Sequence, residues 1–350
     1  MKAKQEKNER RSIWATLWDN DIAFPLVVIL ASFILGAILM LITGVNPLIA
    51  YRVLLKASFG SLNSISETMV KACPLLLCGL GTIVAFRCKF WNIGAEGQIY
   101  AGGIMAALVG NLPLHLPALV HIPLMVLAGA VGGALFAFIP TFLKVKLKIN
   151  EVITTIMFNY IAIHLVGYMV HGPMKGDGFL PMSDKLPPEA CLPRLIPATR
   201  FHLGIIIALV LAGVVYFLIW KTVLGYRIRT VGENIIAARL GGINPVSVVL
   251  WAGLISGGLA GIAGMAEVGG IQTRLVEGFS PGYGYLAVAV GLVGQLKPLG
   301  VVLAAILFGA LLSGSNAMQS TVGVPFTIIY VIEGFMIMVI SARFLKRRVK

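Results

Sequence analysis

Ten apolar stretches divide the chain, and all but one are long enough to cross the hydrocarbon core of a membrane, about 30 Å, as a helix. The eighth is short and rich in glycine, so we expect a broken or re-entrant helix that is surrounded by protein. The pattern predicts an all-α polytopic integral membrane protein with about ten transmembrane helices. The stretches cover residues 22–43, 68–86, 95–112, 118–142, 150–170, 202–220, 246–268, 283–296, 299–318 and 324–342.

The composition supports a membrane protein and excludes a soluble globular one. Hydrophobic residues make up 58% of the 350-residue chain and charged residues only 12%, against about 25% charged residues in soluble domains. The chain also has 40 glycines, which suit membrane helices whose backbones approach closely. In the seventh stretch, Gly253, Gly257 and Gly261 recur every four residues along one face, which predicts tight helix packing there.

The distribution of basic residues predicts the orientation of the chain. The net charge is +14, and Lys and Arg collect in the cytoplasmic loops of membrane proteins. Placing both termini in the cytoplasm puts 20 of the 28 Lys and Arg residues on that side, which explains the charge without a nucleic-acid partner. The expected parts are a cytoplasmic tail over residues 1–21, a transmembrane domain over 22–342 and a basic cytoplasmic tail over 343–350.

Two loops stand out between the apolar stretches. Residues 171–201 contain six prolines, which exclude a helix through the segment and predict an external loop. Residues 221–245 form the long cytoplasmic loop, which is polar but has a helical pattern.

The sequence lacks three short motifs that identify common classes of enzyme. The chain has no GxxxxGK[ST] phosphate loop, no HExxH metal motif and no GxSxG nucleophile motif. Its five histidines are scattered near helix ends, and its four cysteines include no CxxC pair. We therefore expect a transport subunit with no catalytic residues, no metal site and no cofactor of its own.

The segment from Asn92 to Gln98 (Asn-Ile-Gly-Ala-Glu-Gly-Gln) is the first with unusual polarity, because it opens an apolar stretch. One interpretation is a helix start at the membrane interface, in which Asn92 is the N-cap and Glu96 interacts with the helix dipole. The other is that Glu96 and Gln98 face a polar cavity, since an ionisable group at membrane depth usually lines a pathway.

The cytoplasmic loop contains a short predicted helix from about Glu233 to Leu240, with glycines on both sides. A helix of this length is unstable alone in water, so it needs a surface to dock on. The membrane underside and a groove in a partner protein are both possible, and the small residues favour a protein. The residues expected to couple to such a partner are Arg229, Glu233, Asn234, Ala237, Ala238, Gly241 and Gly242.

These motifs, together with the glycine-rich run from Gly284 to Gly309, resemble the permease subunits of bacterial ABC importers of the ribose, branched-chain amino acid and nucleoside branch. The segment from Asn92 to Gln98 is most similar to the nucleoside-type permeases. The resemblance covers about residues 65–340 and implies a multi-pass protein of the bacterial plasma membrane. It also implies cytoplasmic ATPase subunits that bind ATP and Mg, a second related permease and an extracytoplasmic substrate-binding protein.

The expected cargo is a nucleoside or a related compound, with a simple sugar such as ribose as the nearest alternative. An ATPase-independent secondary transporter and an intramembrane enzyme are weaker alternatives. A neutral solute with a ring calls for hydrogen-bonding and aromatic groups along its path. The path residues predicted on this basis are Asn92, Glu96, Gln98, Tyr100, Tyr283, Asn316 and Gln319.

Overall fold

The computed structural model describes residues 23–113 and 116–349, with side chains up to Arg343, and the regular elements of this part of the chain are all helices. The predicted tail over residues 1–21 lies outside the described residues. All ten apolar stretches coincide with helices. The helices are α2 (Ala23–Ile42), α3 (Pro47–Phe59), α4 (Leu62–Arg87), α5 (Ala95–Gly110), α6 (Ala118–Leu147), α7 (Glu151–His171), α8 (Gly204–Lys221), α9 (Val223–Glu233), α10 (Ile235–Leu240), α11 (Pro245–Glu267), α12 (Tyr283–Val293), α13 (Pro298–Val322) and α14 (Thr327–Val349).

Within the described residues, seven helices are long and apolar enough to cross a membrane: α2, α4, α6, α7, α8, α13 and the continuous helix Pro245–Gln272. The last of these combines α11 with a π-helical turn, η2 (Val268–Gln272). The eighth stretch forms α12, which has only 11 residues, as expected for a broken or re-entrant helix. The polytopic all-α architecture is therefore confirmed, and the count of ten spans stays a prediction.

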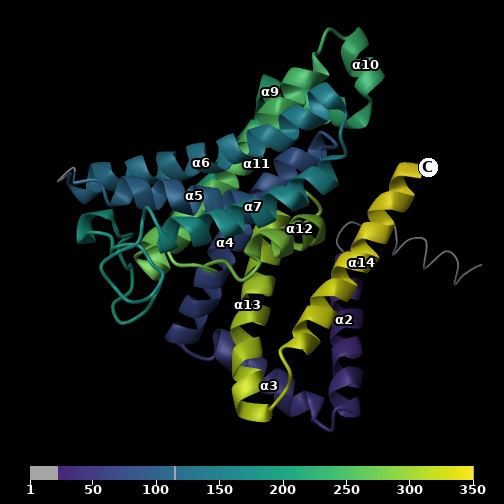
Figure 1. The fold of residues 1–350 in the computed structure, drawn as a ribbon. Helices are drawn as coiled ribbons and strands as arrows, with labels where there is room; N and C mark the ends of the chain where they lie inside the picture. The colour runs from purple at the N-terminus through teal and green to yellow at the C-terminus, as the bar shows by residue number, and fades with distance from the viewer. Residues whose placement is uncertain (1–22, 114–115, 350) are drawn as a thin grey trace, which may run out of the picture. The chain divides into compact units, whose positions relative to one another are not determined.

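The chain divides into two compact units, residues 61–310 and residues 1–60 with 311–350. In the first unit, α11 packs against α4, α5 and α6, and Figure 1 shows α5, α6 and α11 running side by side. The glycines of α11 make this packing close. A Cβ atom at Gly257 would overlap the side chain of Ala137 on α6, and one at Gly261 would overlap the carbonyl oxygen of Gly129.

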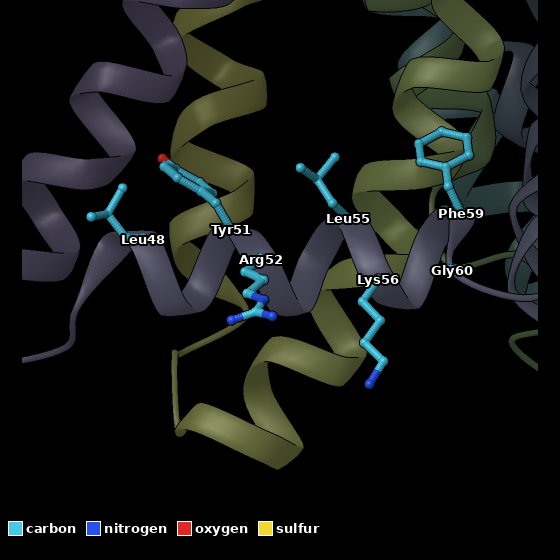
Figure 2. Close-up of a pocket in the computed structure, with 7 residues that line it drawn as sticks. All are labelled: Leu48, Tyr51, Arg52, Leu55, Lys56, Phe59 and Gly60. Atoms are coloured by element: carbon cyan, nitrogen blue, oxygen red, sulfur yellow. The ribbon is translucent and has the colours of Figure 1, made fainter.

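The second unit contains α2, α3, the end of α13 and α14. Helix α2 packs against α14, and the Tyr51 hydroxyl of α3 donates a hydrogen bond of 2.5 Å to the carbonyl oxygen of Phe33 on α2. The apolar-run analysis missed α3, although Asn46 and Pro47 mark its start. An open hollow of about 570 Å³ is lined by side chains of α3. Figure 2 shows that Arg52 and Lys56 project from the opposite side of α3 to Leu55 and Phe59.

The predicted external loop, residues 171–201, is held by the residues that follow α11. The backbone N–H groups of Ser183, Leu186 and Leu192 donate to the carbonyl oxygens of Leu275, Thr273 and Gly269 at 2.8 to 2.9 Å. The loop contains one short 3-10 turn, η1 (Pro188–Ala190), and no helix runs through the segment, as its prolines predict. Pro188 is accommodated because it is the first residue of the turn, where no N–H donor is needed.

Candidate functional site

Two buried amide side chains fix the start of α5. Asn92 and Gln98 exchange hydrogen bonds of 3.0 Å in both directions between their amide groups. Asn92 also donates to the Ser256 hydroxyl of α11 at 3.0 Å, and its oxygen accepts from the Gly94 N–H. Both amides are almost completely buried. The pair therefore connects the turn before α5 to helix α11.

Helix α7 holds the same turn from the other side. Asn159 accepts a hydrogen bond from the Gly97 N–H at 2.8 Å and donates to the Ile93 carbonyl oxygen at 2.9 Å. Thr155, one turn earlier, accepts from the Ile93 N–H at 3.3 Å. Sequence reasoning missed Asn159 and Thr155. The available signal was their spacing of four residues on one face of an otherwise apolar helix.

Glu96 joins the start of α5 to the start of α12. Its carboxylate accepts a hydrogen bond of 2.7 Å from the Gly284 N–H, in the first turn of α12. A carboxylate is favourable here because the N-terminal end of a helix has free N–H groups and a partial positive charge. The backbones are also close, since a Cβ atom at Gly284 would overlap the Glu96 backbone. The short helix α12 thus begins directly against the Asn92–Gln98 turn.

Aromatic side chains complete this cluster. The Tyr100 hydroxyl donates to the Ser280 carbonyl oxygen at 3.2 Å, and its ring lies 4.7 Å from the ring of Phe279. Tyr283 is 7% exposed at the first position of α12. Five of the predicted path residues, Asn92, Glu96, Gln98, Tyr100 and Tyr283, are therefore brought together at the α5–α12 junction. Asn316 and Gln319 lie exposed on the part of α13 that belongs to the other compact unit.

The chemistry of this junction is that of hydrogen bonding and aromatic contact. It brings amide, hydroxyl and carboxylate groups beside aromatic rings, and these side chains are buried. Among the described residues, no group of three or more His, Cys, Asp or Glu side chains is arranged to hold a metal ion.

The predicted coupling helix is shorter than expected and begins later. Asn234 ends α9 and caps α10, accepting hydrogen bonds from the N–H groups of Ile236 and Ala237 at 2.9 and 3.1 Å. The prediction that this helix starts at Glu233 is therefore wrong. Glu233 and Arg229 belong to α9. Asn234 separates the two helices, because its side chain caps the first N–H groups of α10. Gly241 ends α10, and Gly242 follows with φ of +77°.

Apart from Arg239, the exposed side chains of α10 are apolar. Ile235, Ile236 and Leu240 are 47%, 67% and 86% exposed. Ala237 is also exposed, whereas Ala238 is buried within the chain and supports the helix from behind. In the free chain, the exposed side of this helix therefore has large apolar side chains available for a partner.

Basic residues from several loops meet beside α9 and α10. A groove of about 380 Å³ is lined by Lys89, Lys144, Lys148 and Arg239 together with apolar side chains. Lys89 donates to the Glu233 carbonyl oxygen at 3.1 Å, and Lys144 pairs with Glu151 at 2.5 Å. Figure 1 shows α9 and α10 at one end of α6 and α11. This end of the unit is consequently strongly positive.

The chain was compared with known proteins. It is 35% identical to the guanosine ABC transporter permease protein NupP of Bacillus subtilis, over 93% of this chain and 94% of the relative. It is 33% identical to the nucleoside ABC transporter permease protein NupB of Lactococcus lactis, over 93% and 92% of the two chains. It is also 33% identical to the glucose ABC transporter permease protein TsgB13 of Haloferax volcanii, over 92% and 88%.

These relatives come in pairs. Bacillus subtilis also has the guanosine permease protein NupQ, 29% identical over 70% of this chain, and Lactococcus lactis has the nucleoside permease protein NupC, 26% identical over 70%. No solved structure gives a significant match. Residues 64–341 match the family of permease components of branched-chain amino acid transport systems. The chain is a multi-pass membrane protein and belongs to this family of ABC importer permeases.

Proposed function

We propose that the chain forms part of the membrane path of an ATP-driven importer of nucleosides or related compounds. The observation that carries this proposal is the similarity to a guanosine and a nucleoside permease over more than nine-tenths of each chain. The α5–α12 junction supports it, because hydrogen-bonding and aromatic side chains gather there at the start of a short helix. In this proposal Glu96, Tyr100 and Tyr283 border the path.

Asn92 and Gln98 then have a positioning role. Their amides hydrogen-bond each other and Ser256 instead of pointing to a free surface. They keep the turn before α5 in place, so that Glu96 can meet α12. Asn316 and Gln319 remain predicted path residues on the other unit.

The proposed partners are cytoplasmic ATPase subunits that bind ATP and Mg, a second related permease and an extracytoplasmic binding protein. The exposed apolar side of α10 supports an ATPase partner, because exposed apolar side chains that lie together mark a site of interaction. The paired permeases of the relatives support a heterodimer.

The proposed topology has ten membrane helices and both termini in the cytoplasm. Helix α4 supports the sidedness. Its start carries Glu67, which pairs with Arg200 of the external loop through hydrogen bonds of 2.7 and 2.5 Å. Its end carries Arg87, beside the basic residues of α9. The 26 residues of α4 span roughly 39 Å, enough to separate the two faces of a membrane.

Uptake of labelled guanosine, uridine, ribose and glucose, in cells with and without the chain, tests the cargo. We expect nucleoside uptake to be lost when the chain is removed. The similarity to a glucose permease favours a sugar as the second candidate. Loss of ribose or glucose uptake alone, with nucleoside uptake unchanged, would replace the nucleoside proposal by the sugar one.

A further inference from the structure

Two arginines lie against the same tryptophan at the cytoplasmic end of the first compact unit. The guanidinium carbons of Arg87, at the end of α4, and Arg229, on α9, are each 4.7 Å from the centre of the Trp220 ring at the end of α8. Two like charges repel each other, so this arrangement needs compensation. The negative faces of the aromatic ring supply part of it.

A backbone carbonyl also compensates the charge of Arg87, together with the nearby carboxylate of Glu233. The Nε and Nη2 atoms of Arg87 donate to the Leu296 carbonyl oxygen at 3.1 and 2.8 Å. Leu296 lies just beyond α12, where Gln295 and Leu296 both have positive φ, +55° and +52°. Two successive non-glycine residues in this conformation are strained and persist only where the surroundings hold them. Arg87 therefore helps to hold the end of α12.

The backbones of α9 and the α4 end are in direct contact at the same place. A Cβ atom at Gly232 would overlap the Arg87 carbonyl oxygen, so only glycine allows this approach. Next to it, Lys89 Nζ donates to the Glu233 carbonyl oxygen at 3.1 Å. A displacement of α9 must therefore displace the end of α4 or break these contacts.

We infer that Arg87, Trp220 and Arg229 form a coupling clamp, which transmits movement of α9 and α10 to the cytoplasmic end of α12. The inference rests on the proposed function, in which α10 meets an ATPase. Helix α12 has 11 residues and begins at Tyr283, and Glu96 of α5 accepts a hydrogen bond from its first turn. The clamp thus holds one end of the short helix whose other end borders the proposed path. Arg87 is a positioning residue that does not contact the cargo.

The chemistry of the clamp requires a planar guanidinium at position 87. Arginine can stack on Trp220 and donate two hydrogen bonds to one carbonyl oxygen at the same time. Lysine keeps the charge but has neither the planar group nor the paired donors. The substitution Arg87→Lys therefore separates the clamp from a simple requirement for positive charge.

The test uses the complete transporter, with its ATPase, second permease and binding protein, reconstituted in vesicles. The measured quantity is the amount of labelled guanosine transported per ATP hydrolysed. We expect Arg87→Lys and Trp220→Leu each to lower this ratio at least about fivefold, the lower end of typical coupling effects, while ATP hydrolysis persists. The double variant should lose little more than either single variant, because each substitution alone already breaks the clamp.

Arg227→Lys is the matched control. Arg227 is exposed on α9, two residues before Arg229 and outside the clamp, so this substitution should leave the ratio unchanged. A parent-like ratio in both clamp variants would overturn the inference. If Arg87→Lys does not assemble, Trp220→Leu and Arg229→Lys decide by the same ratio, and parent-like values in both would overturn it. Absence of guanosine transport by the parent would instead contradict the proposed function.

Discussion

At the residue scale, the buried amides of the α5 start show why a local motif was informative but incomplete. The segment from Asn92 to Gln98 was noticed because polar residues open an apolar helix. The two interpretations, a helix start and a polar cavity, could not be separated, because the partners Ser256 and Asn159 lie more than 60 residues away. Long-range hydrogen bonds of this kind leave no pattern in the local sequence.

We predict that Asn92→Asp destabilises the protein by about 2 to 3 kcal/mol, because the change removes both amide donors and leaves a buried charge. Thermal unfolding of the detergent-purified protein measures the loss. Asn63→Asp is the control, since Asn63 is exposed in the first turn of α4, and it should unfold like the parent. Equal stability of the two variants would show that the amide pair does not hold the turn.

His202 gives a pH prediction. It lies between the loop over residues 171–201 and α8, and burial lowers its pKa to about 4. Its Nδ1 also accepts the Gly204 N–H at 3.1 Å, which requires the neutral ring. Since unfolded histidine has a pKa near 6.5, the unfolded state binds more protons between these values. Stability is complete above pH 6.5 and falls as the pH drops toward 4, by roughly 2 kcal/mol at pH 5.

Melting temperatures at pH 7 and pH 5 check the histidine prediction. The decrease on acidification should be smaller in His202→Gln, which cannot titrate, than in the parent. An identical decrease in both proteins would assign the acid sensitivity to other groups.

At the element scale, the length of the apolar stretches predicted helices correctly, but the start of the short helix α10 was misplaced. Every apolar stretch proved to be a helix because about 20 apolar residues in lipid have almost no alternative. Helices α3 and α9 were not assigned, because they are amphipathic and too short to stand out as apolar runs. The start of α10 was misplaced because Asn234 serves both as the end of one helix and the cap of the next.

The contact of α11 with α6 gives a prediction at this scale. Gly257→Leu should prevent close packing, because its side chain would overlap Ala137 and the Gly133 carbonyl oxygen, at a cost of about 3 kcal/mol. The yield of monodisperse protein measures the effect. Gly213→Leu on α8 is the matched control, since nothing lies within 4 Å of a Cβ atom there. Similar yields for the two variants would exclude tight packing at Gly257.

At the scale of the whole molecule, sequence reasoning predicted the class of protein and most of its helices. It could not predict which helices pack together, because every membrane helix has an apolar surface. It placed five path residues that the structure brings together at α5 and α12, and two that lie on the other unit. Charge patterning predicted the orientation, and the structure now brings Lys89, Lys144, Lys148 and Arg239 to one groove.

The orientation can be tested with single cysteines in a variant that lacks the four native ones. Because Lys185 belongs to the external loop and Arg239 to α10, Lys185→Cys should react with an impermeant reagent in intact cells. Arg239→Cys should react only after the cells are opened. The reverse pattern would invert the topology and remove the basis for an ATPase at α10.

The central claim is that nucleoside movement through this chain is driven by a partner ATPase. The most direct measurement is uptake of labelled guanosine by vesicles that contain the purified transporter, with ATP supplied on the cytoplasmic side. We predict accumulation with ATP and none without it, and no accumulation when Ile236→Asp places a charge on the exposed side of α10. Accumulation by the chain alone, driven by an ion gradient without ATP, would contradict the claim and identify a secondary transporter.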